Sequence, residues 1–492
     1  MGHLENLPVE IISLIVRFIA NEDIRKTDGG EDDPECYYDD GPHGYHTLID
    51  LCLTSESLRK IAQPMLFEHL EDDDPYGVLR KVGFFARTIW DRPDLAKHVQ
   101  AIEVVPGEWG VADALIAPGR RPALDAPTVK RYEADIKSLK LADKDLWIES
   151  LRQRDISTLT ALVANRTPNV RKISIPRQLK MDRFNRIFDR NPSFLSELEI
   201  FFAESDNTGD CLDVNLCDRI LTRPNLKHVL FDVGTFCNAS SKSKLPPGSV
   251  AAEQVFFRHC HIDSDSIQTL MKACKNLVHF TRANFWPDKI RRVPTDGLPN
   301  EFTAPELLKA ILLHKDTLET FRVDFFHDAS DLENLEEYVS SCSKFGSFRD
   351  FSVLKTILVP QAYLNDHPEF PSSMEHLTIN DCSFSIHKMT ENIAKDYHKG
   401  LYPHLTSIRV VAMDTALPVV FAGSKLPADN TDDDHITELQ EYFKGTSVDY
   451  QVSPYEFDFD EPGGFSIQDV LAHFANVGDN NDGENDEDNG SD

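Results

Sequence analysis

The sequence lacks a hydrophobic run long enough to cross a membrane, and it is poor in basic residues. Its longest apolar stretch, Val9 to Ala20, contains Glu10 and Arg17 and falls short of the roughly 20 apolar residues that span a bilayer. Lysine and arginine number 51 against 82 aspartates and glutamates, a formal net charge of −31. Such a field repels phosphate backbones and anionic lipids. We therefore expect neither nucleic acid nor a membrane as the main partner.

The sequence also lacks paired cysteines and a secretory signal. Its nine cysteines are scattered and form no Cys-x-x-Cys motif, and the first residues have neither a basic region nor an apolar core. Such cysteines are typical of reduced thiols in a protein that does not enter the secretory pathway. We expect a cytoplasmic and/or nuclear location.

Catalytic signatures are missing as well. There is no phosphate-binding loop, dinucleotide fingerprint, nucleophile elbow or His-Glu-x-x-His motif. The nearest metal-like cluster is His259-Cys260-His261 with Asp263 and Asp265. Adjacent strand residues point to opposite faces, so Cys260 cannot easily join both histidines around one ion. We expect no catalytic residue, no metal and no cofactor, and a chain that is not an enzyme.

The N-terminal segment has the pattern of a short helical bundle. Pro8 suits the first turn of a helix. Apolar residues then recur at steps of three and four and form one wide stripe, namely Ile11, Leu14, Ile15, Phe18 and Ile19. An insert from about Asn21 to His46, rich in Asp, Glu, Gly and Pro, is typical of a flexible acidic loop.

Helical patterning resumes after this insert. Leu48 to Leu53 is largely apolar, Thr54-Ser55 offers a helix N-cap, and Pro64 must kink or end the helix that follows. The result is a bundle of about three short helices, which is too small to be very stable unless it packs on a partner or a neighbouring domain.

Two motifs in this bundle resemble the F-box. They are Leu7-Pro8-x-Glu10-Ile11 at its start and Leu58-Arg59-Lys60-Ile61-Ala62-Gln63-Pro64-Met65-Leu66-Phe67 at its end, and the second is especially similar to fungal F-box proteins. The resemblance covers residues 4–70 and is interrupted by the acidic insert, which we expect to be a surface loop that leaves docking intact.

The resemblance implies that the bundle docks the adaptor subunit of an SCF-type ubiquitin ligase and, through it, the cullin scaffold. Some of the matching apolar residues would face the adaptor and others would hold the bundle together, and the pattern leaves open which. These adaptor-binding candidates are Leu7, Pro8, Ile11, Ile15, Leu51, Leu58, Leu66 and Phe67.

A loose repeat begins near residue 95. Each unit has apolar residues at positions that we number 1, 4 and 6, and a stretch with helical spacing precedes most of them, often with a turn such as Pro168-Asn169. Positions 4 and 6 share one face of a strand. The first positions are Val99, Val170, Leu195, Leu226, Ala252, Leu318, Leu354, Met374 and Leu405, with a weaker copy at Leu277 that has Arg282 at position 6.

Helix, turn and strand in repetition predict a solenoid with parallel strands on one side and helices on the other. The irregular spacing is similar to that of degenerate leucine-rich repeats, although a generic α/β domain remains an alternative. The predicted fold is thus α+β overall, with a small all-α F-box bundle followed by an α/β leucine-rich-repeat-like solenoid. The predicted divisions are an F-box domain at 4–70, a linker at 71–94, the solenoid at 95–415, a C-terminal cap region at 416–477 and a disordered acidic tail at 478–492.

Three insertions and one capping helix complete this interpretation. We expect an excursion at 107–150 that is partly helical, from Val129 to Leu151, loops at 234–250 and 284–304, and a capping helix from His435 to Phe443. Long loops on a solenoid often bind partners.

The functional prediction is a substrate-recognition subunit of an SCF-type ubiquitin ligase. Such a subunit is a tether that raises effective concentration and needs no acid, base or nucleophile of its own. Two alternatives remain: an interaction scaffold without a ubiquitin-ligase role, and an enzyme with an unrecognised site in the repeats. No short motif identifies the protein substrate.

Overall fold

The structure is a computed structural model, and the chain forms two compact units. Unit 1 comprises residues 1–277 with 293–301, and unit 2 comprises 278–292 with 302–492. Their boundary lies inside the predicted solenoid range. The structure describes residues 7–22, 43–72, 78–104, 126–153, 155–176, 181–204, 212–232, 234–237, 245–283, 300–324, 341–382, 386–412 and 439–454.

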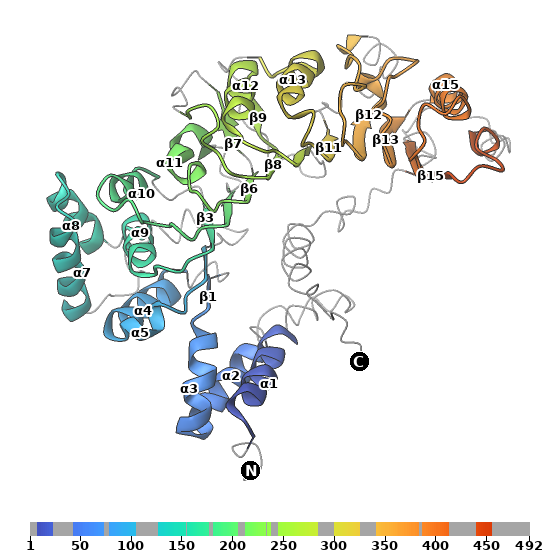
Figure 1. Ribbon diagram of the computed structural model, residues 1–492. Coiled ribbons are helices and arrows are strands. Elements are labelled where there is room, and N and C mark those ends of the chain that lie inside the picture. The colour runs from blue at the N-terminus through green and yellow to red at the C-terminus, as the bar shows by residue number, and fades with distance from the viewer. Residues whose placement is uncertain are drawn as a thin grey trace, which may run out of the picture. The chain divides into compact units, whose positions relative to one another are not determined.

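Unit 1 begins with a bundle of the helices α1 (Val9–Glu22), α2 (His43–Thr54) and α3 (Glu56–Leu66) (Figure 1). The Ser55 hydroxyl accepts a hydrogen bond from the N–H of Leu58 at 3.2 Å and caps α3, as its position predicts. Pro64 lies in the last turn of α3, which ends two residues later. The bundle core consists of Ile12, Val16, Leu48, Cys52, Leu58 and Ala62.

The bundle continues directly into a sheet. Phe67, the first residue after α3, stacks on Phe85 of α4 (Val78–Asp91) with ring centroids 5.6 Å apart. Two residues later β1 (His69–Asp72) begins and pairs in parallel with β2 (Ala101–Val104). Residues 71–94, predicted as a linker, thus include the end of β1, α4 and the first residues of α5 (Pro93–Ala96).

The main sheet of unit 1 is parallel, with the strand order β1-β2-β3-β4-β6-β8. Its helices lie on one side of these strands (Figure 1). The further strands are β3 (Lys172–Pro176), β4 (Ile200–Glu204), β6 (His228–Asp232) and β8 (Gln254–Arg258). The helices are α7 (Ala126–Ser138), α8 (Lys144–Arg152), α9 (Ile156–Arg166), α10 (Met181–Phe188), η3 (Val214–Cys217), α11 (Asp218–Leu221) and α12 (Ser264–Ala273). A second, smaller parallel sheet contains β5 (Leu212–Asp213), β7 (Gly234–Phe236) and β9 (His261–Ile262).

Unit 2 contains another run of parallel strands in chain order, from β10 to β15. Helices again lie on one side of the strands (Figure 1). The strands are β10 (His279–Ala283), β11 (Thr320–Val323), β12 (Thr356–Pro360), β13 (His376–Cys382), β14 (Ser407–Ala412) and β15 (Asp449–Pro454). The helices are α13 (Ala304–Ile311), η4 (Leu312–His314), η6 (Gln361–Tyr363) and α15 (Ile386–His398).

One hydrogen-bond pattern recurs at the start of the strands. The N–H groups of Glu199 and Ile200 both donate to the carbonyl of Arg171, over 2.7 and 2.8 Å. The same pattern joins Gln100/Ala101 to Glu68, Arg171/Lys172 to Gln100, Lys227/His228 to Glu199, Glu253/Gln254 to Lys227, Glu319/Thr320 to Val278, Lys355/Thr356 to Glu319, Glu375/His376 to Lys355 and Thr406/Ser407 to Glu375. Apart from Glu68, which precedes the first unit, these residues occupy repeat positions 2 and 3 once the third unit is counted from Leu198, so each unit begins in the same geometry as the preceding one.

The mixed α/β character and the large parallel sheet that the repeat predicts are confirmed. Pairs such as Ile357↔Leu377 and Leu377↔Ile408 place position 4 of successive units side by side. One predicted register is wrong. Ile173 pairs with Phe201, so the third unit starts at Leu198 and continues through Phe201 and Ala203, three residues later than predicted.

The structure adds elements that the repeat pattern missed. β1 and β15 extend the two runs of strands, and the predicted loop 234–250 contains β7. The predicted helix Val129–Leu151 is two helices, α7 and α8. α7 is anchored where the Tyr132 hydroxyl donates to the carbonyl of Ala86 at 2.7 Å. None of the described helices is long and apolar enough to cross a membrane.

Several predictions lie wholly or mostly outside the described residues. They are the acidic insert between α1 and α2, residues 284–299 of the loop predicted at 284–304, and the tail at 478–492. Of the predicted capping helix, 435–438 are outside, and 439–441 form a single helical turn.

A charge ladder at repeat position 2 gives a first testable prediction. The Glu199 carboxylate lies 3.1 Å from Lys227 Nζ and 3.6 Å from Arg171 Nε, so the charges alternate across three strands. Glu199→Lys would place three cations side by side. We expect it to cost about 1 kcal/mol of stability at low salt, and less at high salt because exposed charges are screened.

Thermal unfolding at low and high salt measures this effect. The matched control is Glu197→Lys, the same charge change at an exposed residue two positions away. An equal loss of stability in both variants would show that the ladder contributes nothing.

Candidate functional site

The most conspicuous surface of unit 1 is an apolar stripe on α1. This helix has two apolar faces. Ile12 and Val16 are 4% and 1% exposed and enter the bundle core, whereas Leu14 and Phe18 are both 64% exposed. Because residues three and four apart share a helix face, Ile11, Leu14 and Phe18 form a continuous stripe on the solvent side. We call these three residues the α1 stripe.

The predicted adaptor-binding residues divide between this surface and the bundle interior. Leu7, Pro8 and Ile11 are exposed at the start of α1, and Ile15 is half-buried beside them. Leu58 is buried in the core, and Leu51 and Leu66 pack against it. Phe67 stacks on Phe85 and joins the bundle to α4. The structure thus separates the surface residues from those that hold the bundle together.

Sequence reasoning placed Leu14 and Phe18 in the apolar stripe but left them out of the adaptor-binding set. It also missed Val9 and Leu53, which are 56% and 72% exposed. The signal that could have found them is an excess: α1 has more apolar residues than one buried face can use. An exposed cluster of large apolar side chains marks an interaction surface.

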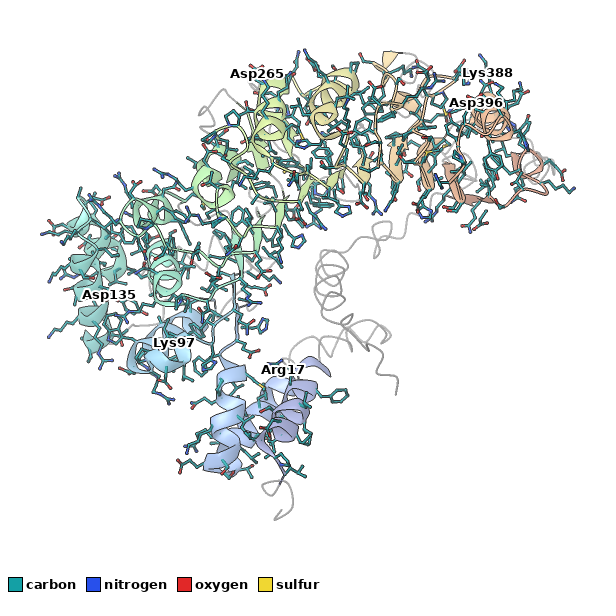
Figure 2. The ribbon with its side chains drawn as sticks, viewed as in Figure 1. Arg17, Lys97, Asp135, Asp265, Lys388 and Asp396 are labelled. Carbon is teal, nitrogen blue, oxygen red and sulfur yellow. The ribbon has the colours of Figure 1, made fainter. Side chains whose placement is uncertain are left out.

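The polar contacts of the bundle are local. Arg59 Nε donates to the carbonyl of Cys52 at 2.8 Å, which ties α3 to α2. Lys60 pairs with Glu56 at 3.0 Å one turn away, and this hydrogen bond lowers the pKa of the exposed Glu56 carboxyl. Burial in the bundle core raises the pKa of the Cys52 thiol. Arg17 lies on the bundle, as labelled in Figure 2.

A second notable cluster lies at the ends of β6 and β8. The Asp232 carboxylate is fully buried and accepts hydrogen bonds from Arg258, one of them at 2.8 Å. His259 Nδ1 lies 3.4 Å from the same carboxylate. Burial alone would raise the pKa of Asp232, but the hydrogen bonds from Arg258 and His259 outweigh it and lower the pKa to about 2.

This cluster accounts for the His259-Cys260-His261 segment. His259 faces Asp232, whereas His261 Nδ1 lies 3.5 Å from a carboxylate oxygen of Glu301. Cys260 is buried between them, with its Sγ 3.3 Å from the carbonyl of Arg258. The three side chains therefore have different partners. Within the described residues, no group of three or more His, Cys, Asp or Glu side chains could hold a metal ion.

Comparison with known proteins adds no family assignment. No protein-family model matches the chain, and a search of curated proteins finds no match.

Proposed function

We propose that this chain is a substrate-recognition subunit of an SCF-type ubiquitin ligase, in which an F-box at residues 4–70 docks the adaptor and a leucine-rich-repeat-like solenoid binds the target. The observation that carries the proposal is the α1 stripe. Three large apolar side chains face solvent on the helix that opens with the Leu7-Pro8 motif. A small bundle with a filled core has no internal use for them, and a docked partner would bury them.

The repeated strands support the second half of the proposal. Equivalent residues pair from strand to strand in parallel, and each unit starts with the same two hydrogen bonds to one carbonyl. Repetition of this kind makes an extended sheet face on which residues from many units can contact one ligand. The bundle passes directly into the first strands of unit 1, because Phe67 stacks on Phe85 and β1 pairs with β2.

In this proposal the chain contributes no chemical group to ubiquitin transfer. It binds the adaptor, and through it the cullin scaffold, and holds the target near the ubiquitin-loaded enzyme. Effective concentration then supplies the rate gain.

Reconstitution with purified adaptor, cullin and ubiquitin-transfer components tests this function. We expect the full chain to bind the adaptor directly and to direct ubiquitin onto a partner captured by the repeats. Adaptor binding without any transfer to a captured partner would favour the interaction scaffold. No adaptor binding at all would contradict the F-box assignment.

The reconstitution is best compared between the full chain and chains with point substitutions in the bundle, and not with a chain that lacks residues 1–70. Such a deletion would cut into β1, whose Leu70 pairs with Ile102, and would remove Phe67 from Phe85. It would therefore damage the sheet as well as the bundle.

A further inference from the structure

The α1 stripe has the spacing of a coiled-coil seam. Ile11, Leu14 and Phe18 follow one another at steps of three and four residues, which are the steps between the a and d positions of a heptad repeat. With Ile11 and Phe18 at a and Leu14 at d, the buried residues Ile12 and Val16 occupy positions b and f. These positions lie on the side of a helix away from its seam. The stripe therefore faces away from the bundle core.

The seam is short, but its side chains are large and open to solvent. Ile11 is 42% exposed, and Leu14 and Phe18 are both 64% exposed. Leu7, which is 39% exposed, keeps the same spacing two residues before the helix begins. An apolar stripe on a helix surface is normally buried against another element. A second copy of α1 offers a stripe of the same length and spacing.

The residues on one flank of the seam have opposite charges. Glu10 and Arg17 both occupy g positions, and both are exposed; Arg17 is labelled in Figure 2. In an antiparallel pair of helices, the g residues of one helix lie opposite the g residues of the other. Glu10 of each copy then meets Arg17 of the other copy. In a parallel pair, Glu10 would instead face the apolar Ile15 of the second copy.

The antiparallel arrangement also aligns the apolar side chains. It places Ile11 of each copy against Leu14 of the other. It places Phe18 against the start of the other helix, where Leu7 and Pro8 are exposed. Both copies use the same residues, so the contact has two-fold symmetry and closes at two chains. Seam and charges thus favour one and the same pairing.

We propose that the free chain forms a two-fold dimer through antiparallel packing of two α1 stripes, and that a second copy and the adaptor compete for this surface. The competition rests on the receptor function proposed above, whereas the dimer does not. One helix from each copy makes a small interface, so we expect a dissociation constant on the order of 10 µM. The dimer covers the stripe until the adaptor displaces the second copy.

The net charge of −31 on each chain opposes this association at long range. At physiological ionic strength, charges farther apart than about 8 Å are largely screened. The apolar contacts of the seam do not depend on this charge, and the paired Glu10 and Arg17 lie in direct contact. Self-association is therefore measured at physiological ionic strength.

Charge reversal at the two g positions tests the arrangement. Sedimentation equilibrium of the full chain without adaptor measures how far its mass rises from one chain toward two. Glu10→Arg alone and Arg17→Glu alone each place like charges opposite each other twice, so each should weaken the dimer at least about tenfold. An equimolar mixture of the two variants restores both pairs and should dimerise at least as tightly as the wild type. Both residues are exposed, so neither change should unfold α1.

The matched control is the same pair of charge reversals on α3 of the same bundle. Glu56 and Lys60 have side chains that are 79% and 74% exposed. Glu56→Arg and Lys60→Glu, alone or mixed, should self-associate like the wild type. Equal effects of the α1 and α3 variants would overturn the proposal, because net charge alone would then explain them. So would a wild-type chain that remains monomeric at about 100 µM, ten times the expected dissociation constant.

Adaptor is then added to the dimer. We expect complexes of one chain with one adaptor. Complexes that hold two chains and two adaptors would overturn the competition, because the chains would then associate through another surface. A monomeric wild-type chain that binds adaptor overturns this inference alone. A dimer with the expected charge dependence that binds no adaptor overturns the proposed ubiquitin-ligase function and leaves the dimer standing.

Discussion

Replacing Leu14 and Phe18 together by glutamate is expected to lower adaptor affinity at least about 100-fold while the chain stays folded. Burying a Leu or Phe side chain contributes about 1.5–3 kcal/mol, and a charge left in an apolar interface costs more. The two losses add up to about 3 kcal/mol or more, and each 1.4 kcal/mol is tenfold in affinity. Both side chains are mostly exposed in the free chain, so folding does not depend on them.

Calorimetric titration of the adaptor into the purified variant measures this effect, and circular dichroism checks the fold. Leu313→Glu is the matched control, since Leu313 is an apolar residue 56% exposed on η4 of unit 2. It should bind the adaptor normally. Retained affinity in the Leu14/Phe18 variant would remove the α1 stripe from the docking surface.

A substitution on the other face of α1 separates docking from folding. Ile12 is 4% exposed and belongs to the bundle core. Ile12→Glu should unfold the bundle and abolish adaptor binding through loss of structure. Only the stripe variant should lose binding with its helical content intact.

The sequence predicted the strands well where the apolar pattern has one solution. The units at Leu318, Leu354 and Met374 have the predicted register because no neighbouring frame places large apolar residues at positions 1, 4 and 6. Burial of positions 4 and 6 is what selects such residues. In these units the spacing of the apolar residues is therefore enough to predict which side chains are buried.

The third unit shows where such a pattern is ambiguous. Leu195, Leu198 and Ile200 satisfy the spacing, and so do Leu198, Phe201 and Ala203. Only the pairing of Phe201 with Ile173 decides between them, and pairing is not a local property. Leu195 instead lies in the preceding turn with a backbone φ of 54°. A leucine in this left-handed region is unusual, and propensity could not have predicted it.

The edge strands were missed because they are polar. In β1 only Leu70 is apolar, and in β15 only Tyr450 and Val452 are. An edge strand has a neighbour on one side only, so its composition is less constrained than that of a central strand.

The sequence also could not predict which adaptor-binding candidates lie on the surface and which lie in the bundle core. Helical periodicity shows that α1 is apolar on two faces, but only the contacts with α2 and α3 show which face is inside.

Replacing Asp232 by alanine is expected to cost unit 1 about 3 kcal/mol of stability, because it leaves the mostly buried Arg258 guanidinium, whose side chain is 13% exposed, without this carboxylate. Asp232 is 0% exposed and its register partner on β8 is Arg258 itself. The pKa of Asp232, about 2, is below that of an unfolded aspartate. Its contribution to stability is therefore fully present above about pH 4 and is lost as the pH falls toward 2.

Hydrogen exchange of the amides of β6 and β8 measures this cost in the full chain, because it reports local stability even when two units unfold separately. Asp189→Ala is the matched control: its pair with Arg219, at 3.0 Å, has side chains 50% and 58% exposed. Such a surface pair should contribute less than about 1 kcal/mol. The double variant Asp232→Leu/Arg258→Met should recover most of the lost stability, since well-packed apolar side chains can replace a buried ion pair. If the double variant is as unstable as Asp232→Ala, the cost comes from packing around Asp232 and not from an isolated charge.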